Sequence, residues 1–118
     1  MGVNAAAVDR SDPWAVAGDA MRRLAAGGPA RLRIEVVRAL GALGLTELAA
    51  AWTDTVPPTP ELAPMVRRIR EVLPTLNPSE ESAEARIGRA RTALAARADL
   101  AEQCGPVFEA WASRQRRL

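Results

Sequence analysis

The first residue whose chemistry could define a function is Cys104, the only cysteine in a sequence without histidine or tyrosine. A reactive thiolate needs a helix N-terminus or a neighbouring base to lower its pKa. Cys104 does precede Gly105–Pro106, where we expect a helix to begin, but its charged neighbours Glu102 and Glu109 are acidic. We therefore predict a buried, unreactive cysteine. The same composition excludes imidazole acid–base chemistry, histidine-ligated metals, disulfide frameworks and zinc-finger spacings.

The next candidates are carboxylates, since Glu80, Glu81 and Glu84 lie close together at the start of an expected helix. Such a group could bind a hard cation or do acid–base work. Acidic residues near the first turn are also what the helix macrodipole favours, and no glycine-rich phosphate-binding loop accompanies them. We therefore predict no catalytic residue, no cofactor and no metal, and we do not expect an enzyme.

Arginine supplies all 16 basic residues, and 14 acidic residues leave a net charge of only +2. Basic stripes are the electrostatic footprint of nucleic-acid binding, because a guanidinium group can bind phosphate in a bidentate manner. Two arginine clusters could play this role, although Glu61 and Glu71 interrupt the first, and the second lies where the macrodipole favours cations. Both a solvated surface and contacts with an anion or nucleic acid stay open. The clusters are Arg67, Arg68 and Arg70, and Arg114, Arg116 and Arg117.

Proline and glycine mark where the elements that carry these residues begin and end. Proline is favoured at the first helical position after a capping residue, and glycine is favoured just past a helix end. Five such starts are Asp12–Pro13, Gly28–Pro29, Thr59–Pro60, Asn77–Pro78 and Gly105–Pro106, with stops at Gly27, Gly44, Pro74 and Gly105. Together they predict six helices, over residues 13–26, 29–43, 46–54, 60–73, 78–104 and 106–117.

The apolar pattern predicts how these helices pack. The helix over 29–43 is apolar around most of its circumference, so we expect it at the centre of the fold. The helix over 60–73 carries an apolar arc that we expect to be buried. No useful stretch alternates with a period of two, so the sequence predicts an all-α fold, a compact bundle of about six helices. The polar strip of 29–43 is Arg31, Glu35 and Arg38, and the arc of 60–73 is Leu62, Met65, Val66, Ile69, Val72 and Leu73.

The fifth predicted helix, over 78–104, is long and alanine-rich, with no internal proline and a single glycine. It carries a narrow seam that suits one close helix partner, because small side chains let two backbones approach. The partner is either the chain's own fourth or sixth helix or the same helix in a second subunit. The seam is Ala83, Ile87, Ala90, Leu94, Ala98 and Ala101.

We expect residues 1–11 to form a flexible leader and 12–118 to form a single helical domain. No stretch approaches 18 consecutive apolar residues, so no membrane partner is expected. The N-terminus lacks the basic start and long apolar centre of a secretory signal. A single cysteine suits a reducing compartment, and a cytoplasmic location is therefore the expectation.

These observations predict a non-catalytic helical module for protein–protein interaction or assembly. Its partner would be another protein or a second copy of the chain, as in a homodimer. The alternative is sequence-tolerant binding of nucleic acid through the arginine-rich helix faces. The two readings differ in their response to salt, because only phosphate binding weakens steeply as salt rises.

Overall fold

The computed structural model describes residues 9–76 and 82–116, and these ranges contain helices and no strand. The predicted all-α bundle of six helices is confirmed. Of the leader expected over residues 1–11, the structure describes 9–11, where Arg10 forms an ion pair with Glu35 (Nη1 to Oε1, 3.1 Å). The helices are α1 (Pro13–Ala25), α2 (Leu32–Ala42), α3 (Thr46–Thr53), α4 (Ala63–Leu76), α5 (Ala83–Ala95) and α6 (Ala98–Arg116).

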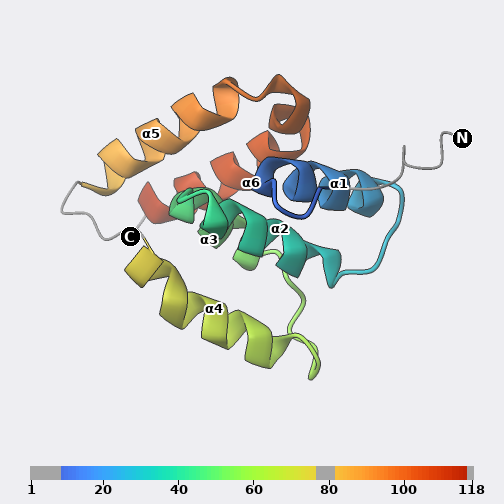
Figure 1. The fold of residues 1–118 in the computed structure, drawn as a ribbon. Helices are drawn as coiled ribbons and strands as arrows, with labels where there is room; N and C mark the ends of the chain where they lie inside the picture. Colours follow the sequence, from blue (N-terminus) through green and yellow to red (C-terminus); the bar gives the residue numbers. More distant parts are fainter. Residues whose placement is uncertain (1–8, 77–81, 117–118) are drawn as a thin grey trace, which may run out of the picture.

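Helices α1, α2, α3 and α6 form the centre of the bundle, and α4 and α5 lie on opposite sides of it (Figure 1). Helix α2 packs against α1 and α3, and α5 packs against α6 and α3. The burial expected for the second helix is confirmed, since each of its large apolar side chains before Leu43 is at most 3% exposed. They are Leu32, Ile34, Val36, Val37 and Leu40. Helix α2 packs against α1, α3 and α4, however, whereas α3 contacts α2, α4, α5 and α6 and is the more central helix.

Side-chain caps and glycines set several helix ends as the sequence indicates, but α2 and α4 begin three residues later than expected, at Leu32 and Ala63. The Asp12 carboxylate accepts a hydrogen bond from the Trp14 N–H, and the Thr59 hydroxyl accepts one from the Leu62 N–H. Gly27 and Gly44 follow helix ends with φ of +92° and +78°, a backbone region that glycine enters without steric cost. The cap expected at Asn77 lies outside the described residues, and α5 is capped instead by Ser82, whose hydroxyl accepts from the Ala85 N–H.

The long fifth helix expected over 78–104 is wrong, because the chain turns at Ala96 and Arg97 and separates α5 from α6. One straight helix of that length would extend for about 40 Å and carry its second half away from the core. The turn instead folds α6 back beside α5 (Figure 1), so that Leu94 and Leu100 are both buried. The Arg97 guanidinium lies over the Trp14 ring, 4.6 Å from its centroid, and this contact holds the turn against α1. Tertiary packing overrides local helix propensity here.

The helix boundary expected at Gly105–Pro106 is also wrong, since both residues lie inside α6. A proline removes the hydrogen bond to the carbonyl four residues earlier, here that of Glu102. Pro106 and Glu102 are both exposed, so water can replace the missing bond. Pro74 likewise lies in the last turn of α4 on an exposed position, and does not stop that helix at residue 73.

The middle of the predicted seam packs inside the chain. Ile87, Ala90 and Leu94 are 3%, 4% and 7% exposed and belong to the main core, where α5 meets α6 and α3. Ala83 is exposed, Ala101 lies on α6 and is partly buried against the same core, and the Ala98 side chain lies outside what the structure describes. Of the partners that the sequence allows, the chain's own sixth helix is therefore the one that these residues contact.

Shortening Ile87 to valine should lower the free energy of unfolding by about 0.5–1.5 kcal/mol, because one buried methyl group is lost. Urea denaturation measures this loss, and Ile69→Val on α4 is the matched control because Ile69 is only partly buried. Light scattering should give the same mass for both variants and the parent. A shift of the Ile87→Val mass toward a smaller species would instead mean that the seam joins two subunits.

Candidate functional site

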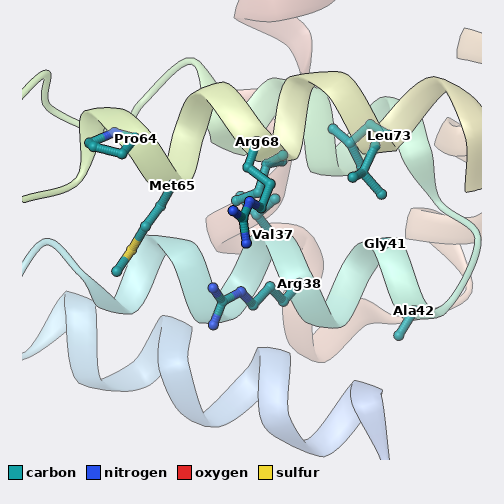
Figure 2. A pocket seen from close by; sticks show the side chains of 10 residues that line it. Val37, Arg38, Gly41, Ala42, Pro64, Met65, Arg68 and Leu73 are labelled. Carbon is teal, nitrogen blue, oxygen red and sulfur yellow. The ribbon is translucent and has the colours of Figure 1, made fainter.

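A surface groove runs between α2 and α4, and it has a volume of about 610 Å³. In Figure 2 the two helices form its walls, with Met65 reaching across from α4 toward α2. The small residues Gly41 and Ala42 of α2 lie below Leu73 of α4 in the same view. The α2–α4 groove, as we name it, is lined by Val37, Arg38, Gly41, Ala42, Pro64, Met65, Arg68, Ile69, Val72 and Leu73.

The groove exists because the apolar arc of α4 is wider than the surface that covers it. Leu62 and Val66 pack with Ile34 and Val56 in a small second cluster, and Leu73 reaches the main core. The expectation that the whole arc is buried is wrong for two of its six residues. Met65 and Val72 are 38% and 43% exposed, and they are the large apolar side chains that the described part of the chain leaves uncovered.

Two arginines give the groove its charge, Arg38 on α2 and Arg68 on α4. In Figure 2 Arg68 reaches from α4 toward α2, and the guanidinium group of Arg38 points toward the end of the groove where Met65 lies. None of the ten lining residues is acidic. Both arginines are exposed, and neither forms an ion pair with a residue in the described ranges. The groove therefore combines an apolar surface with two arginines that form no ion pair with a described residue.

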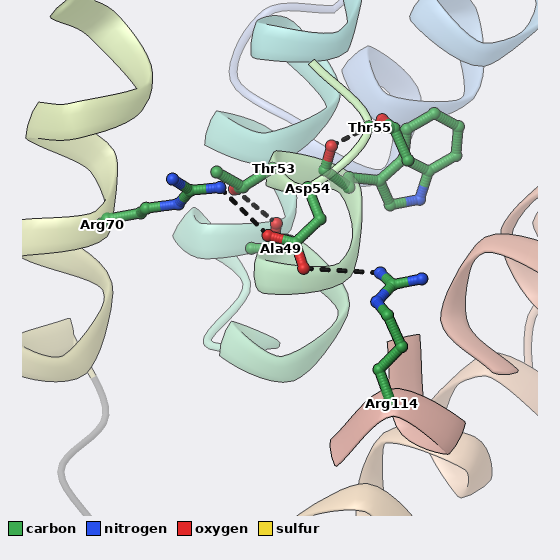
Figure 3. Close-up of polar contacts among 7 residues, drawn as sticks. Ala49, Thr53, Asp54, Thr55, Arg70 and Arg114 are labelled. Atoms are coloured by element: carbon green, nitrogen blue, oxygen red, sulfur yellow. Dashed lines mark hydrogen bonds and ion pairs between the residues drawn. The ribbon is translucent and has the colours of Figure 1, made fainter. Parts of the chain in front are cut away.

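Asp54, at the end of α3, connects both predicted arginine clusters (Figure 3). Its two carboxylate oxygens accept hydrogen bonds from Arg70 of α4 at 3.2 Å and from Arg114 of α6 at 3.4 Å. The clusters therefore do not form one free basic surface, because a member of each is held by the same carboxylate. These contacts also tie α4, one wall of the groove, to the end of α3.

The other members of the clusters lie apart from this carboxylate. Arg67 is exposed and has no ion pair with a described residue, and Arg68 belongs to the α2–α4 groove. The side chain of Arg116 and the whole of Arg117 lie outside the part of the chain that the structure describes. Of the groove residues, the sequence predicts Arg68 as an anion contact, and it predicts Met65 and Val72 as part of the buried arc of α4.

Cys104 lies in the main core, 0% exposed. Burial raises the pKa of its thiol, and a hydrogen bond from the Trp52 indole N–H (Nε1 to Sγ, 3.1 Å) lowers it by less. A thiol held protonated and out of contact with solvent is a poor nucleophile. The burial that the sequence predicts for Cys104 is confirmed.

The raised pKa of Cys104 should make the free energy of unfolding depend on pH. Unfolding restores the ordinary thiol pKa of about 8.5, so the unfolded chain loses this proton first and stability should fall as pH rises beyond that value. The sequence has no histidine, lysine or tyrosine, so the α-amino group is the other titrating group between neutral pH and the arginine range. Urea denaturation between pH 7 and pH 10 should show this fall in the parent protein. A Cys104→Ala variant with the same slope would exclude Cys104 as its cause.

The described residues were also compared with the requirements of a metal site and of a membrane-spanning helix. They contain no group of three histidine, cysteine, aspartate or glutamate side chains arranged to hold a metal ion. No helix within them combines the length and apolarity needed to cross a bilayer. Comparisons of the chain with protein-family models, curated proteins and solved structures find no match. The α2–α4 groove is therefore the feature from which a function can be argued.

Proposed function

We propose that the chain is a non-catalytic protein-interaction module that binds another protein in the α2–α4 groove. The observation that carries this proposal is the exposure of Met65 and Val72 in a groove whose lining is mostly apolar, with Arg38 and Arg68 among it. Contiguous apolar surface rimmed by polar groups marks interaction sites on soluble proteins, and methionine and arginine are enriched at the centres of interfaces. The α2–α4 groove contains Met65 as well as Arg38 and Arg68.

Sequence-tolerant nucleic-acid binding has weaker support from the same residues. A phosphate backbone would have to compete with Asp54 for Arg70 and Arg114. Nucleic-acid grooves in proteins combine basic side chains with aromatic rings on which bases stack, whereas the α2–α4 groove is lined by aliphatic side chains and has no aromatic residue. The apolar lining favours a protein partner.

Site-specific photo-crosslinking in the native cells tests this proposal. A photoreactive residue at Val72 should yield a discrete cross-linked protein, and adding Met65→Asp should abolish it, because a carboxylate in the apolar wall opposes docking. The matched control places the photoreactive residue at Ala85, which is exposed on α5, on the side of the bundle opposite α4 (Figure 1).

Equal products from Val72 and Ala85, or products that survive Met65→Asp, would contradict the proposed docking site. A cross-linked species that disappears on nuclease treatment would replace it with the nucleic-acid reading. Circular dichroism of each variant should remain that of a folded helical protein, so that loss of cross-linking reports on docking.

A further inference from the structure

We infer that the groove takes an amphipathic α-helix whose apolar face is flanked by acidic side chains. This inference rests on the proposed function and adds the chemistry of the partner. Three observations carry it: the helical walls of the groove, its length, and the charge of Arg38 and Arg68.

The helical walls of the groove favour a helical partner segment, which we call the guest. Both are α-helices, and a helix interior uses its backbone N–H and C=O groups within itself. An extended segment would therefore find no edge with which to pair its own backbone, unlike a strand added to a sheet. A helical guest satisfies its backbone internally and needs only side-chain contacts, as in other helix-in-groove complexes.

The length of the groove sets the size of the guest. Its α4 wall extends from Pro64 to Leu73, which is roughly 15 Å at the helical rise of about 1.5 Å per residue. A guest helix of about three turns covers that distance. Met65 and Val72, seven residues apart, lie on the same face of α4, so a guest with apolar residues at i, i+3 or i+4, and i+7 matches both ends.

The arginines set the charge of the guest. Arg38 and Arg68 come from opposite walls and form no ion pair within the described ranges, so a guest in the groove lies against two cations. Guanidinium groups form short, bidentate hydrogen bonds with carboxylates. Glutamate or aspartate beside the apolar face of the guest would complement the pair.

The same charge argues against a second copy of this chain as the occupant. A two-fold symmetric dimer places the same patch on both sides of the interface, so the arginines of the groove would face each other, and like charges oppose association. A head-to-tail contact with another surface of the chain would leave an unfilled groove at one end and tend toward open polymers. An acidic helix from a different protein meets neither problem.

Three synthetic helical peptides of fourteen residues test the inference. They share one leucine-rich apolar face and differ only at the flanking positions, which are glutamate, glutamine or lysine. Fluorescence anisotropy at about 0.1 M salt, where screening is moderate, should show the glutamate peptide binding about tenfold or more tightly than the glutamine peptide, with the lysine peptide weakest.

Charge reversal supplies the decisive comparison. In the Arg38→Glu/Arg68→Glu variant the order should invert, so that the lysine peptide binds most tightly. The matched control is Arg22→Glu/Arg31→Glu, which changes the net charge equally at exposed arginines that do not line the groove. That control should keep the original order, and the thermal midpoints of both variants should show that they fold.

The outcomes separate this inference from the proposed function. Equal binding of the glutamate and glutamine peptides, with both lost in Met65→Asp, overturns the acidic partner and leaves the protein-binding groove standing. No saturable binding of the glutamate peptide overturns the inference, and so does an unchanged order in the reversed variant. Displacement of the peptide by dodecanoate at lower concentration than by a second peptide would assign the groove to a lipid carboxylate instead.

Discussion

Replacing Phe108 with alanine should lower the free energy of unfolding by about 3–5 kcal/mol, the usual cost of removing a buried phenylalanine side chain. Among the residues that the structure describes, Phe108 is the largest fully buried side chain, at 0% exposed. It lies on the inner face of α6, and its ring centroid is 5.8 Å from that of Trp111. Its removal would leave a cavity in the core where α6 meets the rest of the bundle.

Urea denaturation followed by circular dichroism measures this cost. Phe108→Leu is the matched variant, because it keeps most of the apolar volume and should lose clearly less stability than the alanine variant. A loss below about 1 kcal/mol for Phe108→Ala would show that α6 does not pack in the core.

Replacing Leu40 with alanine should cost about 2–5 kcal/mol, because Leu40 is 0% exposed in α2, which packs against α1, α3 and α4. The matched control is Leu43→Ala at the end of the same helix, where the side chain is only partly buried. We expect the Leu43 variant to lose less than half as much stability, since less apolar surface is exposed and a smaller cavity remains. Equal losses would contradict the burial of the Leu40 face of α2.

The fold could be predicted from the sequence where the deciding signal is local. Asp12 caps the start of α1 through a hydrogen bond from the nearby Trp14 N–H, so its effect depends on a few neighbouring residues. Thr59 accepts a similar bond in the turn that leads into α4. Gly27 and Gly44 adopt positive φ just past helix ends for a similarly local reason. The all-round apolar pattern of α2 predicts its enclosure because no single neighbour could cover such a helix.

The turn at Ala96 and Arg97 could not be predicted in this way. No glycine or proline marks it, and alanine on both sides favours a continuous helix. The turn depends on long-range contacts, such as that of Arg97 with Trp14 and the burial of Leu100. Pro106 shows the converse, because a residue with a strong local preference is tolerated inside α6 on an exposed position.

The α2–α4 groove could not be predicted from the sequence for a related reason. Helical periodicity shows that Met65 and Val72 share the apolar arc of α4, but it does not show how much of that arc a neighbour covers. Coverage is set by where the chain holds α4, through the Asp54 contact with Arg70 and the small cluster around Val66. An apolar arc with arginine within it, as at Arg68, is the one local signal of an incompletely buried face.

The most direct test of the central claim, that the α2–α4 groove is the docking surface, is a nuclear magnetic resonance titration of the isotope-labelled protein with the glutamate peptide. We predict that the amide and methyl signals that shift belong to the lining residues of both walls, including Gly41, Ala42, Met65 and Val72. Signals of the exposed face of α5, such as those of Ala85, should stay in place. Shifts centred on α5, or on the exposed surface of α6, would contradict the account.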